Sequence, residues 1–536
     1  MRAAPFAFTL AALLRAAVAR ADDRPADPSN YRAVLATLRP GDTMRLAAGS
    51  YGLLNVSGLN GRADAPIVIA GPVSGAPAVF NADRGPCCNT IELRNASYVV
   101  LRGLTVDGGG VAGAFGVSAG GGAANLVHHI TVEGCTFLHH DASQQTVAIS
   151  TKTPTWGWVI RGNVIRGAGT GLYLGNSDGS SPFVGGLIEG NLVEDTVGYN
   201  MEIKYQRSRP AVAGLPTDPQ TTVIRHNVWV KSDRASPDGD RPNVLVGGFP
   251  DAGAGSMDRY EVYGNVFLHN PRESLFQASG RVTVHDNLFV DVAGTALLLR
   301  NHDLPLRQAF VYHNTFYAVG RGVVFGSAAA QGSAVVGNVI FSPSPVSGPI
   351  AVQRDNLTDS VPNAAMHVAA PSITPGMMDF YPRVGRCQGA AVDVSPFAGD
   401  RDRDVDFNCA PRGADTFRGA YAGEGSNPGW RVVAAPRPVV CGGTVDGGAS
   451  DAAVADVSAV DVSAVDAAVA DASAMEAGAP DASDADVADD APVADAPGAP
   501  APAGGCGCAT PVRAYGSWAW LVVAASALTR RRRARA

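Results

Sequence analysis

An asparagine that opens a run of β-forming residues recurs at seven places in the middle of the chain. Repeats of about 20 to 40 residues, each with one strand–turn–strand unit, are typical of solenoids. Because asparagine tolerates the left-handed backbone of a tight turn, we expect stacked turns about 4.8 Å apart whose amides hydrogen-bond as a ladder. The seven are Asn163, Asn191, Asn227, Asn265, Asn287, Asn314 and Asn338, and Cys135 holds the same place in an eighth copy.

Composition agrees with an all-β solenoid. The 536 residues include 63 glycines, only 17 % are charged, and bursts of Val, Ile, Leu and Phe alternate with Gly, Asn and Asp. Such short strands could also form a sandwich or a propeller. Since the asparagine always opens the same strand, we predict a right-handed parallel β-helix.

The two ends differ from the middle. Residues 1–21 carry Arg2, an apolar run and Ala19-Arg20-Ala21, which predicts a secretory signal peptide. Residues 442–503 are rich in Asp, Ala, Val and Pro and contain neither Lys nor Arg, so we expect a disordered, acidic linker. The folded body is predicted to span 22–441.

The last 33 residues, 504–536, combine three features in order. Cys506 and Cys508 come first, the apolar run Trp518–Leu528 follows, and an arginine cluster ends the chain. This arrangement resembles the myxobacterial C-terminal sorting signal, which implies processing near Cys506 by sorting machinery and attachment at the cell surface. A plain membrane anchor with its arginines on the cytoplasmic side is the alternative.

Charge and cysteine usage limit the partners of the body. The acidic linker and the basic tail account for most of the unbalanced charge, and the remaining body is slightly acidic, which argues against nucleic acid as a ligand. Export permits disulfides, and we favour the pair Cys387–Cys409 in the loop-rich C-terminal part. The other body cysteines are Cys87, Cys88, Cys135 and Cys441, and no spacing typical of a metal site accompanies them.

The start of the body carries a family resemblance. Asn30–Gly71, with Leu38-Arg39-Pro40-Gly41-Asp42 and Pro66-Ile67-Val68-Ile69, resembles the beginning of secreted parallel β-helices of the pectin-lyase-like superfamily. This implies a short helical cap followed by the first coils. Residues 419–430 are expected to close the other end.

Period-2 alternation identifies one outward column of side chains. It places Met201 and Ile203 inward and Glu202 and Lys204 outward. In the same register Gly175 and Gly247 flank Lys204, which predicts a trough with a cation at its floor. Tyr173, Gln277 and Arg300 fall along the same face and would contact substrate together with Glu202.

Loop lengths point to the same region. The gaps around Asn227 are 36 and 38 residues, so we expect excursions near 206–221, 231–242 and 249–259 that bring Arg209, Arg241 and Asp258 beside the column. Lys204 is one of only three lysines among 42 basic residues. A lysine with a lowered pKa is a candidate general base, and a lysine that pairs with a carboxylate is the alternative.

These residue types suit β-elimination on a uronic-acid polysaccharide. Glu202-Ile203-Lys204 followed by Arg241 resembles the chondroitinase B and alginate lyase family, which implies catalytic roles for Lys204, Arg241 and Arg209 and a possible Ca²⁺ cofactor. Signatures of polygalacturonases and mannuronan epimerases are absent, and we expect His128-His129 and His139-His140 to be exposed turn residues. A non-catalytic, glycan-binding adhesin on an acidic stalk is the alternative function.

Overall fold

The computed structural model describes residues 22–81, 89–438 and 441. The predicted signal peptide, the acidic linker, the tail with Cys506 and Cys508, and the pair Cys87-Cys88 lie outside these residues. In the described part of the chain, no helix has the length and apolar character needed to cross a membrane.

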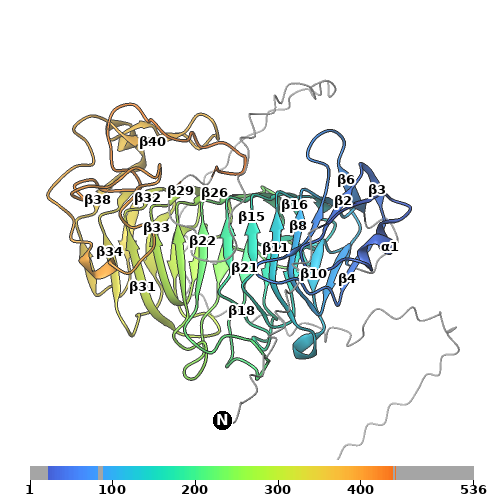
Figure 1. The fold of residues 1–536 in the computed structure, drawn as a ribbon. Coiled ribbons are helices and arrows are strands. Elements are labelled where there is room, and N and C mark those ends of the chain that lie inside the picture. The colour runs from blue at the N-terminus through green and yellow to red at the C-terminus, as the bar shows by residue number, and fades with distance from the viewer. Residues whose placement is uncertain (1–21, 82–88, 439–440, 442–536) are drawn as a thin grey trace, which may run out of the picture. The chain divides into compact units, whose positions relative to one another are not determined.

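Three long sheets run along the molecule, and each coil of the chain adds one strand to each of them (Figure 1). Every pairing within these sheets is parallel, which confirms the predicted parallel β-helix; the right-handed sense follows the usual rule for such crossovers. The first sheet contains β1 (Asp23–Ala26), β2 (Thr43–Leu46), β5 (Ile67–Ala70), β8 (Ala96–Arg102), β11 (Val127–Glu133), β15 (Val159–Arg161), β19 (Leu187–Glu189), β22 (Thr221–Arg225), β25 (Arg259–Tyr263), β28 (Gly280–His285), β31 (Leu306–Tyr312), β34 (Ser333–Val336) and β37 (Val352–Arg354).

The second and third sheets complete each coil. The second contains β3 (Gly49–Tyr51), β6 (Ala78–Asn81), β9 (Thr105–Asp107), β12 (Thr136–His140), β16 (Val164–Ala168), β20 (Leu192–Thr196), β23 (Val228–Lys231), β26 (Val266–Asn270), β29 (Leu288–Val292), β32 (Thr315–Tyr317), β35 (Val339–Phe341) and β38 (Leu357–Asp359). The third contains β4 (Leu54–Ser57), β7 (Ile91–Arg94), β10 (Val117–Ala119), β13 (Val147–Thr151), β17 (Thr170–Leu174), β21 (Met201–Ile203), β24 (Val244–Val246), β27 (Phe276–Ala278), β30 (Thr295–Leu299), β33 (Arg321–Phe325) and β36 (Ser344–Ser347).

Few other elements occur among the described residues. The predicted N-terminal cap is the short helix α1 (Tyr31–Leu35), whose Tyr31 ring packs edge-on against Tyr51 of the first coil. The smaller pairs are β14 (Thr155–Trp156) with β18 (Phe183–Val184) and β39 (Val368–Ala370) with β40 (Asp379–Pro382); the 3₁₀ turns are η1 (Gly122–Ala124), η2 (Val361–Met366) and η3 (Ser395–Phe397).

The core is a continuous apolar column inside the coils. Inward residues of all three sheets contribute, because successive residues of a strand point to opposite faces. Phe267, Phe289 and Phe316 occupy the same position in successive coils, and their rings stack at 4.7 and 4.6 Å between centroids. Equal positions therefore repeat at the strand spacing, which makes each coil a template for the next.

The asparagine ladder is present in full. Each asparagine from Asn163 to Asn338 donates its backbone N–H and its Nδ2 to Oδ1 of the next one, at 2.9–3.0 Å and 2.8–3.1 Å. Asn356 ends the ladder as a further member, and the backbone N–H of Cys135 donates to Asn163 at its start.

We had expected the asparagine to be the left-handed residue of each turn, but the residue before it has that conformation. The φ angles there run from 52° at His313 to 65° at Gly264. The ladder asparagines themselves do not have positive φ angles, and their amides reach along the stack. Glycine, aspartate and histidine precede the ladder residues because they tolerate the left-handed conformation.

Cys135 faces the same carbonyl groups that the ladder amides use. Its Sγ lies 3.5 Å from Leu101 O and 3.5 Å from Glu133 O, which correspond to Ile224 O and Tyr263 O around Asn265. We predict that Cys135→Asn raises the free energy of unfolding by about 1 kcal/mol, because an amide would satisfy both carbonyls and extend the ladder. Cys135→Ala is the matched control and should be mildly destabilising. Equal denaturant midpoints for the two variants would contradict the prediction.

The C-terminal part of the body packs along the outside of the coils. Residues 361–437 turn back over the coils, visible in orange above β26, β29, β32 and β38 in Figure 1, and pack on the outer face of the second sheet and on part of the first. Ala420 and Tyr421, which we had expected in a closing segment, are buried in this layer with Phe407. The outward residues of the second sheet, such as Val266 and Leu288, are apolar, so this face requires a cover.

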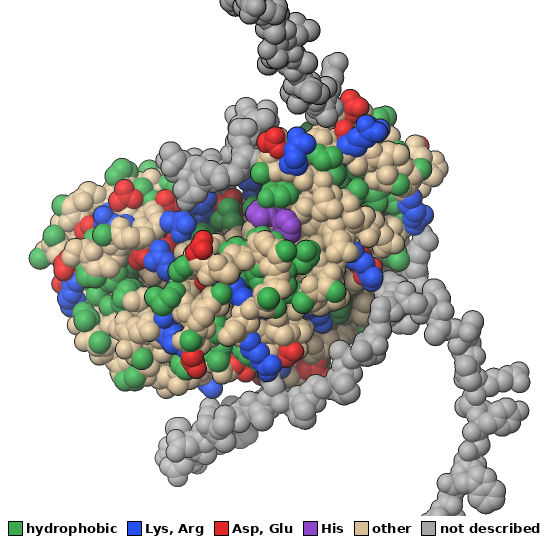
Figure 2. Space-filling model, turned by 60° about the horizontal axis from the view of Figure 1, so that its bottom comes forward, with side chains coloured by type: hydrophobic (Ala, Val, Ile, Leu, Met, Phe, Trp, Pro, Cys, Tyr) green, Lys and Arg blue, Asp and Glu red, His purple; other side chains and the backbone are tan. Residues whose placement is uncertain are grey.

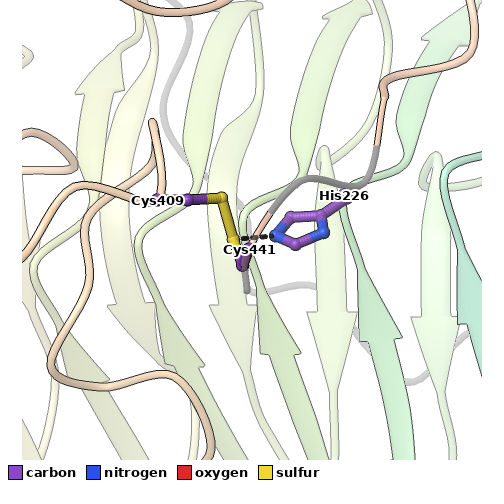
Figure 3. Close-up of side chains that lie close together, drawn as sticks. All are labelled: His226, Cys409 and Cys441. Carbon is purple, nitrogen blue, oxygen red and sulfur yellow. Dashed lines mark hydrogen bonds between the residues drawn. A yellow bond between two sulfur atoms is a disulfide. The ribbon is translucent and has the colours of Figure 1, made fainter. Parts of the chain in front are cut away.

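The disulfide joins Cys409 to Cys441 and not Cys387 to Cys409 (Figure 3). Cys387 is a buried free thiol in the covering layer. Arg437 explains the observed pairing, because its guanidinium donates to Phe407 O and Gly264 O and stacks 3.9 Å above the Phe407 ring. This anchoring brings the end of the body beside Cys409.

Reduction of this disulfide should loosen the covering layer without unfolding the coils. The chain-entropy model assigns about 4 kcal/mol to a loop of this length, and the contacts released are those of the final residues. We predict faster proteolysis after residue 400 in Cys441→Ser and in reduced wild type. Cys387→Ser, which removes a thiol but no bond, should keep the wild-type response to reductant. Unchanged cleavage in Cys441→Ser would contradict a clamping role.

Candidate functional site

The predicted outward column lies on the third sheet. Strand register aligns Tyr173 with Glu202, Glu202 with Leu245, and Leu245 with Gln277. Met201 and Ile203 point into the core with no exposed surface. The predicted alternation of β21 is therefore confirmed, and Leu245 separates Glu202 from Gln277.

Lys204 belongs to the neighbouring column, just beyond the end of β21. Its backbone N–H donates to Leu174 O at 2.9 Å, and the N–H of Gly247 donates to Ile203 O at 2.8 Å. Gly175 and Gly247 therefore flank Lys204, as predicted. Arg300 lies three coils from Lys204, and its N–H donates to Ala278 O.

The glycines do not leave an open trough, which corrects the prediction. A Cβ added to Gly247 would lie 2.2 Å from Tyr205 N, and one added to Gly175 would lie 3.3 Å from Lys204 Cβ. Both glycines permit close approach of neighbouring chain. Glu202, Lys204 and Gln277 are only 3 %, 9 % and 6 % exposed, so this face is closed over.

Glu202 and Lys204 form a buried ion pair. Lys204 Nζ lies 2.8 Å from Glu202 Oε1. Burial by itself lowers the pKa of Lys204, but Glu202, Tyr173 and Asp303 outweigh that effect and hold the pKa above its usual value. Lys204 therefore stays protonated, and the alternative of a carboxylate partner describes this state better than a general base does.

Arg209 and Asp258 form a second enclosed pair. Their side chains are 2 % and 3 % exposed and are ion-paired, and Asp258 Oδ1 also accepts the backbone N–H of Gln220 at 2.9 Å. Burial raises the pKa of Asp258 despite this partner. Arg209 thus links the 206–221 excursion to the 249–259 excursion through Asp258. Its enclosed guanidinium does not fit the predicted catalytic role.

Arg241 lies at the wrong end of the strands for a site with Lys204. The register of Met201 with Val244 puts Arg241 before the start of β24, whereas Lys204 follows the end of β21. Its guanidinium donates to the carbonyls of Asp238 and Asp240 in its own loop. The predicted Lys204–Arg241 partnership is therefore wrong.

Sequence reasoning named Arg209 and Asp258 but missed the charges beside them, at the corner between the third and first sheets. We call Arg209, Arg281 and Arg307, with Asp251 and Asp258, the arginine corner. Arg281 Nε donates to Gln331 Oε1 at 3.0 Å, its Nη1 donates to Ser256 O, and Arg307 pairs with Asp251. A register shift between Gly280 and Arg281 places Arg307 as an extra residue beside Arg281. The sequence signal for this corner is the 38-residue spacing between Asn227 and Asn265, which predicts the 249–259 excursion.

No described residues suit a Ca²⁺ ion near Lys204. Glu202 is buried in its ion pair, and the one described group of three possible ligands is His226 with Cys409 and Cys441. His226 Nε2 lies 3.5 Å from Cys441 Sγ (Figure 3), but both sulfurs are bonded to each other. Hard Ca²⁺ prefers oxygen ligands, so the implied cofactor does not fit this set.

The histidine pairs are not simply exposed turns. His140 is fully buried, and the Nδ1 atoms of His128 and His129 lie 2.7 Å apart. The rings of His129 and Tyr98 stack at 4.5 Å, and those of His128 and Trp156 at 4.3 Å. Burial lowers the pKa of His128 to about 4, so the pair is neutral. Only His139, paired with Asp107, is largely exposed as predicted.

A shallow cavity of about 270 Å³ lies on the second sheet. Its lining residues are Arg166, Glu194, Asp195, Val230 and Lys231. Burial lowers the pKa of Lys231 to about 7, but its Nζ donates to the carbonyls of Gly198 and Arg241. These contacts make Lys231 a tie between the coil and the 231–242 excursion.

His269 fastens the same excursion and should make it sensitive to pH. Its Nδ1 and Nε2 lie 2.7 Å and 2.9 Å from Asp291 and Asp233, and the Asp291 hydrogen bond is the main cause of its raised pKa. A raised pKa means that the stabilisation is complete below pH 6.5, the usual histidine value, and is lost as pH rises through the folded-state value. We predict that the melting-temperature gap between wild type and His269→Gln shrinks over that range. A constant gap would contradict this.

Comparisons with known proteins do not assign this chain to a family. No protein-family model and no curated protein matches the sequence. Three solved structures are similar at TM-scores of 0.40, 0.42 and 0.35: a pectate lyase (15 % identity, 63 % of this chain, 80 % of that one), the A-module of an Azotobacter vinelandii mannuronan C-5 epimerase (18 %, 60 %, 91 %) and a PL6-family polysaccharide lyase from Pseudopedobacter saltans (12 %, 64 %, 94 %). Likenesses at these levels carry no argument about activity.

Proposed function

We propose that this protein binds an acidic polysaccharide at the arginine corner. One observation carries the proposal: three arginines gather there with two aspartates, which leaves one positive charge in excess. The body around it is slightly acidic, and on the face drawn in Figure 2 basic and acidic side chains are interspersed. A local excess of planar guanidinium groups suits the carboxylates of a uronic-acid chain.

The long excursions support a binding role at this place. Residues 249–258 extend from the rigid coils, and Ser256 O and Asp258 contact Arg281 and Arg209 from this segment. Binding groups on loops over a rigid scaffold are the common arrangement. Exposed Arg207 and half-buried Arg300 add positive charge to the segments that follow β21 and β30.

The proposal includes export and attachment at the cell surface. Its support is the sequence alone: the predicted signal peptide, the acidic linker and the Cys–apolar–Arg tail. Such a protein would present a glycan-binding body outside the cell. Deleting 504–536 should release the body into the medium, and continued cell association of the truncated chain would overturn the anchoring part.

Titration with defined polymers tests the binding proposal. Full-length protein should bind polygalacturonate or alginate in calorimetry, with an affinity that falls as salt rises. Neutral dextran is the matched control and should not bind. Equal affinity for dextran, or binding to the acidic polymers that salt does not weaken, would overturn the proposal.

A lyase activity is the second candidate. The observation in its favour is that protonated Lys204 interacts with both Glu202 and Tyr173, which joins a cation for a uronate carboxylate to a phenol that could carry a proton. β-Elimination would break the C4–O bond, remove the C5 proton and leave an unsaturated sugar. Far-ultraviolet absorbance of that product on incubation with uronate polymers would support a lyase, and its absence across all of them would leave the binding protein.

A further inference from the structure

One ion pair of the arginine corner differs from the others in how its partners are exposed. The Asp251 side chain is 81 % exposed, while its partner Arg307 is 14 % exposed. Asp251 therefore covers the outer side of a largely enclosed guanidinium. In the Arg209–Asp258 pair both side chains are enclosed, so that pair is a fixed part of the fold.

Asp251 does not satisfy every hydrogen-bond donor of the Arg307 guanidinium. Its Nε is buried and has no hydrogen-bond partner among the described residues. The register shift puts Arg307 beside Arg281, and Gln331 links the two by accepting from Arg281 Nε and donating its backbone N–H to Arg307 O. Burial first and Arg307 second lower the pKa of Arg281, as expected for two cations held close together.

The Asp251 carboxylate can leave Arg307 by a change of its own side chain, because 81 % of that side chain is exposed. An ion pair with one exposed partner contributes little to stability. Displacing the Asp251 carboxylate therefore requires neither opening of the core nor loss of the Ser256–Arg281 contact.

We propose that Asp251 is an internal stand-in for the ligand, so that a carboxylate or sulfate group of a sugar chain binds Arg307 and Arg281 in its place. This rests on the proposed polysaccharide binding and names the residues that take the anionic group. An internal competitor lowers the apparent affinity for the ligand. The apparent Kd equals the intrinsic Kd divided by the fraction of molecules in which the site is free. Removing the competitor should strengthen binding, although a residue of the binding region is lost.

Calorimetric titration of full-length variants with a galacturonate oligomer tests this. Asp251→Asn should bind about tenfold more tightly than wild type, because a charge-assisted contact no longer competes. Asp64→Asn is the matched control, since Asp64 is 77 % exposed and paired with an arginine, Arg62. This pair is distant in sequence from the arginine corner. Arg307→Gln should weaken binding about tenfold, and the double variant Asp251→Asn/Arg307→Gln should lose the gain. Equal gains in Asp251→Asn and Asp64→Asn, or weaker binding in Asp251→Asn, would overturn the stand-in.

Inorganic sulfate separates failure of this site from failure of the proposed function. Sulfate should raise the melting temperature of Asp251→Asn more than that of Asp64→Asn, and Arg307→Gln should abolish the difference. If sulfate behaves so but no acidic glycan binds, the anion site stands and polysaccharide binding fails. If acidic glycans bind while sulfate affects all variants equally, the assignment to Arg307 and Arg281 is overturned. A sulfated oligomer beside the galacturonate oligomer identifies which anionic group is preferred.

Discussion

Replacing Asn265 by alanine should lower the free energy of unfolding by roughly 3–5 kcal/mol. Asn265 is fully buried, and its Oδ1 accepts both the N–H and the Nδ2 of Asn227. Its own Nδ2 donates to Asn287, Ile224 O and Tyr263 O. Alanine leaves the Asn227 N–H without an acceptor and opens a space between two coils, and denaturant unfolding measures the loss.

Asn356 provides the matched control because it ends the ladder. It accepts from Asn338 but is only partly buried, and its Nδ2 donates to Val335 O. Asn356→Ala should therefore cost about 1 kcal/mol. Comparable losses at the two positions would show that the asparagines contribute singly and that the stack between coils adds nothing.

The second large effect is expected at the buried ion pair of the third sheet. Lys204→Met should cost roughly 3–5 kcal/mol, because it leaves the Glu202 carboxylate charged and enclosed. Since the pKa of Lys204 is raised, the pair's contribution is complete below the usual lysine pKa and is lost only as pH rises through the raised value. Thermal unfolding of wild type should therefore show no loss from this pair near neutral pH.

Two further variants separate this burial cost from any role in chemistry. Glu202→Gln/Lys204→Met removes both charges and should recover most of the stability. Arg62→Met, which breaks the exposed Arg62–Asp64 pair, should change stability by less than about 1 kcal/mol. If Lys204→Met is as stable as wild type, the other interactions of Glu202 or water access compensate for its charge, and Lys204 is not needed to stabilise it in solution.

The coils could be predicted from sequence because their information is local and repeated. Every coil places Asn and its flanking β-formers in the same order, and period 2 then fixes that Ile203 points inward and Glu202 outward. The left-handed position was assigned one residue too late, since both glycine and asparagine tolerate it. Asn356 escaped notice because only 18 residues separate it from Asn338.

The site could not be derived in the same way because loops carry no period. The excursion lengths predicted where loops leave the coils, but not that Arg241 would cap its own loop or that Arg209 would pair with Asp258 inside the fold. The register shift beside Arg281 is a local irregularity without a composition signal. Likewise, Cys441 finds Cys409 only because Arg437 is held at Gly264, a contact 173 residues apart.

The Cys409–Cys441 bond has a mechanical consequence. Any tension along the chain beyond Cys441 enters the body at that residue, and the covalent bridge passes it to residue 409 within the covering layer. The parallel strands of the coils, whose hydrogen bonds could be opened one after another by a pull on the last strand, are bypassed. Load is spread instead over the broad apolar contact with the second sheet, so a pulled molecule should yield by shear of that layer before any coil unwinds.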